Sequence, residues 1–226
     1  SELVITADSE VQVNEGDPAL NLDLGVSYGE VLEHLRLASD PDTIEAKEFL
    51  LNSPMIEAGE ALLAYASPSF EPGRSLKSCV GDLTSRIFAD FSYDPGFTNI
   101  ATPLSDVLEH RRGVCQDFAH LQIGCLRAMG IPAKYVSGYI ETLPAPGEEK
   151  LVGADATHAW VSVWEPAFGW IDFDPTNDLV PSTDHVALAH GRDYRDISPV
   201  SGVVIGAGGQ SLKVGVDVVP AGSGKD

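Results

Sequence analysis

Cys115 is the side chain in this sequence with the clearest capacity for covalent chemistry. It lies in RGVCQDFAHL (residues 112–121), directly after a glycine turn and in the first turn of a predicted helix. A thiol at a helix N-terminus meets unpaired backbone N–H groups and the positive end of the helix dipole, which favour the thiolate. Cys79 and Cys125 fall within or beside apolar helical stripes, where a buried structural cysteine is the better interpretation. Cys115 is therefore the candidate nucleophile.

A thiolate mechanism needs a base, and His158 is the best candidate among the six histidines. It lies in a predicted strand over residues 157–164 with two tryptophans on the same face, which indicates an apolar, partly closed surrounding. A lone strand histidine is more often a structural residue, so the strand pattern alone does not decide its role. His120 follows Cys115 by five residues and therefore points away from it around the helix. Surface or capping roles suffice for the other four: His34, His110, His185 and His190.

A carboxylate on a neighbouring strand could hold the imidazole in the correct tautomer through a hydrogen bond. The sequence GWIDFD (residues 169–174) supplies Asp172 and Asp174, and the two-residue period of a strand puts both on one face. Asp174 also begins a DPTN turn, which gives it a purely structural alternative. The pattern therefore leaves both aspartates open as the third partner.

The elements that must position these residues change in character along the chain. Apolar residues at helical spacing predict helices over residues 54–66, 75–91, 103–110 and 115–129. Gly113 is predicted to end the third helix, because glycine readily adopts a left-handed backbone conformation. β-rich runs predict strands over residues 3–13, 133–140, 157–164, 169–173, 202–205 and 211–219. Helices followed by antiparallel strands indicate an α+β fold with one main domain.

The composition argues against several classes of partner. The 34 acidic and 14 basic residues give a net charge of −20, which repels phosphate groups, so neither nucleic acid nor membrane is an expected partner. No apolar stretch is long enough to span a bilayer, and the first residues lack a signal-peptide pattern. The three cysteines have no CxxC spacing, and no Asp-x-Asp-x-Asp-Gly calcium loop occurs. We expect a soluble, cytoplasmic protein that uses no metal or other cofactor; its oligomeric state is not defined by the sequence.

Three ordered blocks carry a resemblance to a known family. They are GVCQDFAH with the following LRAMGIPAKYVSGY (residues 113–120 and 126–139), THAW (157–160) and FDPTN (173–177). Together they resemble the bacterial branch of the transglutaminase-like superfamily from about residue 91 to residue 177. The stretch 185–219, with GRDY at 191–194, is similar to the tail of those proteins.

The resemblance implies a papain-like fold, with the nucleophile helix packed on an antiparallel sheet that carries the histidine and the aspartate. By matching motifs, Cys115 takes the nucleophile position, His158 the base and Asp174 the orienting position, which decides for Asp174 over Asp172. Members of this branch usually carry a β-rich segment ahead of the helical region. Residues 1–20 are then expected to be the end of such a segment, cut off upstream. The catalytic domain would span 21–220, with a helical part at about 28–130 and a β part at about 131–220, before a flexible tail at 221–226.

The implied activity is acyl transfer through a thioester on Cys115. We favour a cysteine protease or amidase acting on a peptide or protein, because the tryptophan that animal transglutaminases place before the nucleophile is absent, as is a calcium loop. An amine-accepting transglutaminase and a non-catalytic binding module are the alternatives. The backbone N–H of Cys115 is the first candidate oxyanion donor, Tyr93 or Gln116 the second, and Trp160 is a further candidate for lining the substrate site.

Overall fold

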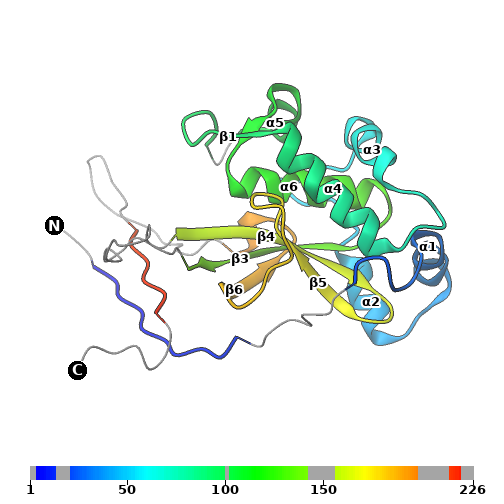
Figure 1. Cartoon of the computed structure of the whole chain (residues 1–226), viewed down its shortest axis with the longest axis horizontal. Helices are drawn as coiled ribbons and strands as arrows, with labels where there is room; N and C mark the ends of the chain where they lie inside the picture. The colour runs from blue at the N-terminus through cyan, green and yellow to red at the C-terminus, as the bar shows by residue number, and fades with distance from the viewer. Residues whose placement is uncertain (1–3, 14–20, 100–101, 142–155, 198–213, 220–226) are drawn as a thin grey trace.

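The protein consists of helices that cover one face of a four-stranded antiparallel sheet (Figure 1). The computed structural model describes residues 4–13, 21–99, 102–141, 156–197 and 214–219. The helices are α1 (Tyr28–Leu37), α2 (Pro41–Glu48), α3 (Glu60–Ala66), α4 (Leu76–Asp90), α5 (Leu104–His110) and α6 (Cys115–Ala128), with short 3-10 turns η1 (Ser67–Ser69) and η2 (Tyr194–Ile197). The strands are β1 (Ser92–Tyr93), β2 (Arg112–Gly113), β3 (Ala133–Ile140), β4 (Ala156–Glu165), β5 (Gly169–Phe173) and β6 (His185–Gly191). The expected α+β fold is confirmed.

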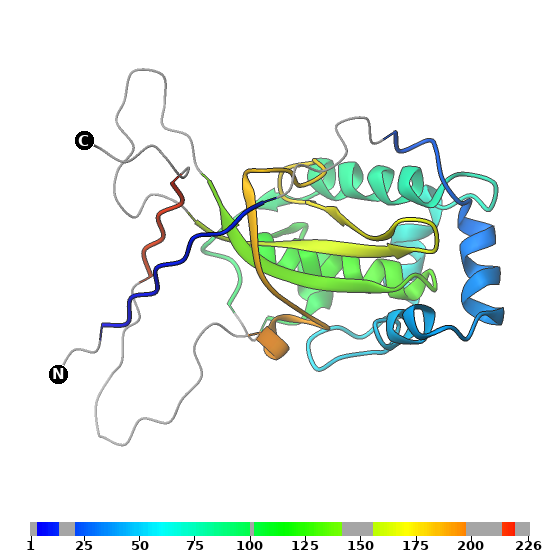
Figure 2. The ribbon, with the colours of Figure 1, turned by 90° about the horizontal axis from the view of Figure 1, so that it is seen from below.

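The sheet has the order β5-β4-β3-β6, and every neighbouring pair is antiparallel. The alternation of β4 turns Ala159, Val161 and Val163 into the hydrophobic core that this sheet shares with α6. Figure 2 shows α6 running beneath the central strands. This shared core fixes the first residues of α6 relative to the first residues of β4. A site assembled from both elements requires such a rigid arrangement.

Helix α6 is the central helix of the protein. Its apolar residues are buried around its whole circumference, from Phe118 near its start to Leu126 in its last turn. A helix buried on all sides must be covered by neighbouring elements, and here α3, α4 and α5 cover the side away from the sheet. Its predicted span of 115–129 agrees with the observed one, and Gly130 follows it in the left-handed conformation (φ 78°).

Two helix predictions need correction. The helix predicted from residue 54 begins at Glu60, because Ser53 and Ile56 exchange backbone hydrogen bonds (2.9 and 3.1 Å) in a tight turn around Pro54. The left-handed residue that ends α5 is Arg111 (φ 56°), not Gly113. The guanidinium of Arg111 lies over the rings of Tyr65 and Phe91, 4.7 and 4.8 Å from their centroids, which favours its unusual backbone conformation.

The strand predictions over residues 133–140, 157–164 and 169–173 are confirmed as β3, β4 and β5. β6 was not predicted, because its region resembles a loop in sequence. Residues 4–13 and 214–219 belong to no named strand; they run extended beside each other in Figures 1 and 2. The predicted strand at 202–205 and the first part of the one at 211–219 lie outside the described residues. Every helix in the described segments is too short or too polar to cross a bilayer.

Candidate active site

Cys115 is the first residue of α6 and is half-buried, whereas Cys79 and Cys125 are fully buried as predicted. The chain is held on either side of it. Before it, Gly113 pairs with Tyr93 in the short β1–β2 sheet. After it, the Asp117 carboxylate accepts hydrogen bonds from the Val114 N–H (2.8 Å) and the Thr98 hydroxyl (2.6 Å). A Cβ at position 113 would overlap the Asp117 side chain, so glycine is required there for close approach.

His158, on β4, is the histidine that reaches the Cys115 side chain. Its Nε2 lies 2.7 Å from Oδ2 of Asp174, and the ring is buried. Burial opposes protonation of the imidazole, but hydrogen bonds to the Asp174 carboxylate and the Cys115 side chain, together with their charges, outweigh it. Together these interactions raise the pKa of His158 to about 9. The three residues that the motifs single out are therefore brought together.

Asp174 follows β5 and is fully buried. Its Oδ1 accepts the backbone N–H groups of Thr176 (2.9 Å) and Asn177 (3.3 Å), and its Oδ2 accepts the Asn177 side-chain amide (2.7 Å). Burial alone would raise its pKa. Hydrogen bonds from His158, His185 and Asn177 and the charge of His158 hold the pKa of Asp174 far below its ordinary range.

Asp172, the alternative left open by strand alternation, has another partner. Its Oδ2 accepts the indole N–H of Trp160 at 2.8 Å. Trp160 is almost completely buried and stacks at 6.0 Å on the His158 ring. The indole N–H of Trp160 therefore already has an acceptor, and its ring stacks against the His158 imidazole.

His185 is the residue of this site that the sequence analysis missed. It begins β6 and is buried, contrary to the expected surface or capping role. Its Nε2 lies 3.1 Å from the same Asp174 oxygen that His158 contacts. One donor atom from each of His158, Asp174 and His185 lies within 4.8 Å of the others, a spacing that could hold a metal ion. The 2.7 and 3.1 Å contacts are, however, hydrogen bonds between these same atoms, so both Nε2 atoms and the carboxylate oxygen already have partners.

Tyr93 and Tyr135 lie close enough to Cys115 to feel its charge. Burial, and then the charge of Cys115, raises the pKa of both phenols. Tyr93 is exposed, whereas Tyr135, on β3, is buried and was not among the sequence candidates. Gln116 is half-buried in the first turn of α6. Tyr93 and Gln116 thus remain candidate oxyanion donors.

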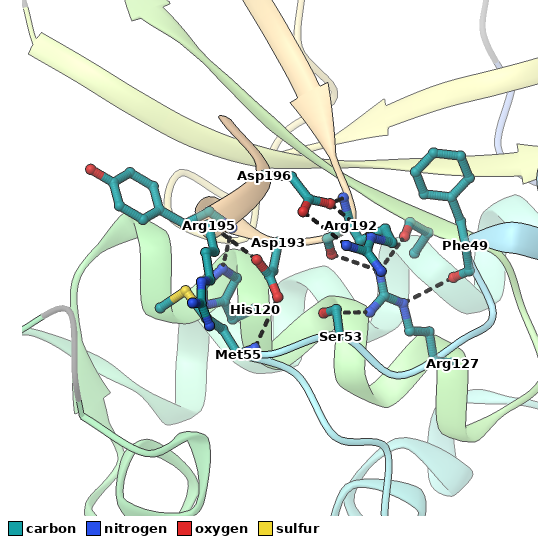
Figure 3. Close-up of polar contacts among 11 residues, drawn as sticks. Phe49, Ser53, Met55, His120, Arg127, Arg192, Asp193, Arg195 and Asp196 are labelled. Carbon is teal, nitrogen blue, oxygen red and sulfur yellow. Dashed lines mark hydrogen bonds and ion pairs between the residues drawn. The ribbon is translucent and has the colours of Figure 1, made fainter. Parts of the chain in front are cut away.

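A second buried polar cluster lies along α6, away from the thiol (Figure 3). The Arg127 guanidinium donates to the carbonyl oxygens of Phe49 (2.9 Å), Ala133 (3.2 Å) and Arg192 (2.6 Å) and to the Ser53 hydroxyl (3.2 Å). Fully buried Asp193 accepts the backbone N–H groups of Met55 (2.9 Å) and Arg195 (2.8 Å).

His120 belongs to this second cluster. Its Nε2 accepts the Tyr194 backbone N–H at 3.1 Å, and its ring packs 5.0 Å from that of Tyr135. Burial, and then the charge of Arg127, lowers the pKa of His120 to about 4. Its predicted direction, away from Cys115, agrees with these contacts. The cluster joins α6 to the loop before α3 and to the GRDY stretch after β6.

Comparison with known proteins gives matches over most of the chain. An uncharacterized protein of Mycobacterium tuberculosis is 44% identical over 96% of this chain and 70% of its own length. A protein-glutamine gamma-glutamyltransferase of Pseudomonas aeruginosa is 32% identical over 53% of this chain and 20% of its own length. A solved structure from Cytophaga hutchinsonii, provisionally described as a cysteine protease, is 31% identical with a TM-score of 0.60; the match covers 76% of this chain and 55% of that one, so this chain spans about half its length.

The family assignment follows from these matches together with the motifs. The family model described as the transglutaminase-like superfamily matches residues 72–175, which include α4, α6, β3, β4, β5 and the positions of Cys115, His158 and Asp174. The 44% identical relative extends the similarity over nearly the whole chain. The chain belongs to the transglutaminase-like superfamily.

Proposed function

We propose that the chain is a thiol-dependent acyl-transfer enzyme that hydrolyses a peptide or carboxamide bond through a thioester on Cys115. One observation carries the proposal. His158 is bonded on one side to the buried Asp174 carboxylate and interacts on the other with the side chain of a half-buried cysteine at a helix start. Nucleophile, base and orienting acid are the parts that acyl transfer requires.

In the first half-reaction the His158 ring takes the thiol proton. Because Nε2 is occupied by Asp174, the nitrogen left for this proton is Nδ1. The thiolate then attacks the carbonyl carbon, and the backbone N–H of Cys115 is the proposed donor that stabilises the oxyanion. The C–N bond breaks as His158 returns the proton to nitrogen, so ammonia or an amine leaves and Cys115 holds the acyl group as a thioester.

In the second half-reaction water attacks the thioester. His158 takes a proton from the water, the C–S bond breaks, and the proton returns to sulfur as the carboxylic acid departs. Asp174 stays ionised throughout and stabilises the imidazolium that forms in each half-reaction. The similarity to the Cytophaga hutchinsonii structure, which covers three quarters of this chain, supports hydrolysis.

A transglutaminase reaction, in which a primary amine replaces water, is the second candidate. The specific observation that favours it is the 32% identity to the Pseudomonas aeruginosa gamma-glutamyltransferase across the part of the chain with the family motifs. Both reactions use the same thioester and differ in the acceptor that reaches it. A non-catalytic binding module is the third candidate function. Such a module would retain the fold, but its Cys115 thiol would not be reactive.

A protein or peptide is the proposed substrate, because a net charge of −20 disfavours nucleic acid and anionic membrane surfaces. None of the three cysteines is in a disulfide. A free thiol is needed for catalysis, so we propose a reducing compartment such as the cytoplasm as the place of action.

Alkylation by iodoacetamide tests the proposal without a known substrate. Cys79 and Cys125 serve as internal references, because burial raises the pKa of both thiols, that of Cys125 to about 12. We expect Cys115 to be alkylated first at pH 7, and His158→Gln to slow that alkylation by about tenfold or more. Equal rates for Cys115 in the two proteins would exclude a thiol activated by His158.

The acceptor is identified with a glutamine-containing protein and a fluorescent primary amine. Ammonia release without incorporation of the amine supports hydrolysis, whereas incorporation supports the transglutaminase reaction. Either activity should vanish in Cys115→Ala and persist in Cys79→Ala, the matched control. Activity that persists in Cys115→Ala would contradict both reactions.

A further inference from the structure

His185 is bound to the carboxylate that orients the candidate base. It lies on β6, which pairs with β3 and not with the strand of His158 or the one before Asp174. Its Nε2 approaches Asp174 Oδ2 at 3.1 Å, while His158 Nε2 approaches the same oxygen at 2.7 Å. One carboxylate oxygen therefore lies between two buried imidazoles whose ring centroids are 5.7 Å apart.

The hydrogen-bonding requirements fix which nitrogen of His185 carries a proton. An ionised carboxylate only accepts hydrogen bonds, so Nε2 of His185 must be the N–H that points at Asp174. Its Nδ1 is buried and has no hydrogen-bond partner among the described residues. A buried polar atom without a partner costs free energy, so packing alone does not explain an imidazole at this position.

The surroundings of His185 separate it from the thiol. With Trp160, Asp172 and Trp170 it lines a cavity of about 500 Å³, and neither Cys115 nor His158 is among the residues that line this cavity. His185 also packs edge-to-face on Trp160, with 5.2 Å between ring centroids. Its polar contact with the candidate active site is thus the bond to Asp174.

We propose that His185 is a positioning residue that holds Asp174 in the orientation in which it aligns His158. The inference rests on the proposed function. Thr176 and Asn177 fix Oδ1 through their backbone N–H groups, while Oδ2, the oxygen that meets His158, is held only by side chains. The His185 N–H restrains that oxygen together with the Asn177 amide, and it stays in place while the proton moves on and off Nδ1 of His158.

Three variants test this role. His185→Leu removes the donor at similar volume, whereas His185→Gln can place an amide N–H near the position of Nε2. His190→Leu, at an exposed position of the same strand, is the matched control. We expect His185→Leu to slow iodoacetamide alkylation of Cys115 at pH 7 about tenfold, and His185→Gln and His190→Leu to stay within about twofold of the unaltered protein. Thermal unfolding of each variant checks that the fold is retained.

The same experiment separates this inference from the proposed function. If His158→Gln leaves alkylation of Cys115 unchanged, the proposed function fails and the positioning role fails with it. If His158→Gln slows alkylation but folded His185→Leu does not, or if His185→Gln loses as much rate as His185→Leu, only the positioning role is overturned. In an Asp174→Asn background, His185→Leu should cause little further loss, because both act through one carboxylate.

A measurement on the unaltered protein covers the case in which His185→Leu does not fold. Nitrogen NMR of ¹⁵N-histidine-labelled protein distinguishes protonated from unprotonated ring nitrogens. We expect Nε2 of His185 to be protonated, with its proton protected from exchange by burial. The opposite tautomer would overturn the proposal, since no hydrogen could then lie between His185 and Asp174.

Discussion

The protein contains two buried clusters that each combine an aspartate with histidine, and the pKa of histidine is shifted in opposite directions in the two. We call them the Asp174 cluster (His158, Asp174, Asn177, His185) and the Asp193 cluster (His120, Arg127, Asp193). Each contains a fully buried aspartate and a buried histidine. In the first the pKa of His158 is raised to about 9, and in the second the pKa of His120 is lowered to about 4.

The difference lies in what satisfies each carboxylate. Both oxygens of Asp193 accept backbone N–H groups, and His120 bonds a backbone N–H instead of an acid. One oxygen of Asp174 is held only by side chains, the His158 and His185 imidazoles and the Asn177 amide, and the His158 imidazole also reaches a half-buried thiol. A buried aspartate paired to backbone holds loops in place, whereas one paired to an imidazole beside a nucleophile can support proton transfer.

Replacing the two histidines should separate the clusters most strongly. His158→Gln removes the base, and we expect turnover of an amide substrate to fall on the order of 10⁶-fold. His120→Gln keeps an acceptor for the Tyr194 N–H, so turnover should stay within about threefold while thermal stability falls. Steady-state rates and unfolding midpoints of both variants check this. A comparable loss of turnover in His120→Gln at unchanged fold would remove the functional distinction.

Replacing the two aspartates should give a smaller contrast of the same kind. Asp174→Asn removes the charge that stabilises imidazolium and favours the wrong tautomer, so we expect turnover to fall about 10⁴-fold. Asp193→Asn turns an amide N–H toward a backbone N–H and should cost about 1–3 kcal/mol of unfolding free energy, with turnover of folded protein unchanged. Denaturant titrations and rates measured on the folded fraction distinguish the outcomes; turnover lost in Asp193→Asn alone would reverse the assignment of the clusters.

The Asp174 cluster and the adjacent Cys115 could be predicted in part from sequence. Cys115 was identified by its place at a helix start, and α6, β3, β4 and β5 followed from apolar periodicity. The choice of Asp174 over Asp172 came from family resemblance, because strand alternation puts both on one face. The structure explains the choice physically, since Asp172 accepts the Trp160 indole N–H instead.

The rest could not be predicted because it depends on distant contacts. His185 lies on a strand whose sequence resembles a loop, and it meets Asp174 only when β6 pairs with β3. The Asp193 cluster joins residues more than 60 positions apart, such as Arg127 and Arg192. The family resemblance includes the GRDY stretch, but its buried aspartate gives no local periodic signal.

A substitution in the Asp193 cluster should lower the stability of the protein and leave the reactivity of Cys115 unchanged. Arg127→Lys keeps the charge but cannot reproduce a planar guanidinium that serves four acceptors from three segments of chain. We expect the unfolding free energy to fall by about 3 kcal/mol, because buried carbonyl groups lose their donors. Alkylation of Cys115 in the folded protein should keep its rate. A slower alkylation at intact fold would show that this cluster also sets the geometry of the thiol.

The opposite pKa shifts give the two clusters opposite pH dependences, an effect smaller than the losses of turnover expected for the Asp174 cluster. His158 binds its proton more tightly when folded, so its contribution to stability is complete below pH 6.5 and is lost as pH rises toward 9. His120 is held neutral when folded, so its contribution is complete above pH 6.5 and is lost as pH falls toward 4. Each change should be on the order of 3 kcal/mol, measured as the pH-dependent difference in unfolding free energy between the unaltered protein and His158→Gln or His120→Gln.

Cys115→Ala adds a control that acts on one cluster alone. The Cys115 side chain is one of the partners that raise the pKa of His158, so its removal should reduce the loss of stability between pH 6.5 and 9. It should leave the loss between pH 6.5 and 4 unchanged, because the pKa of His120 depends on burial, Asp193 and Arg127. If Cys115→Ala leaves the alkaline slope as it is, the thiol does not share a proton with His158, and the Asp174 cluster would be as purely structural as the Asp193 cluster.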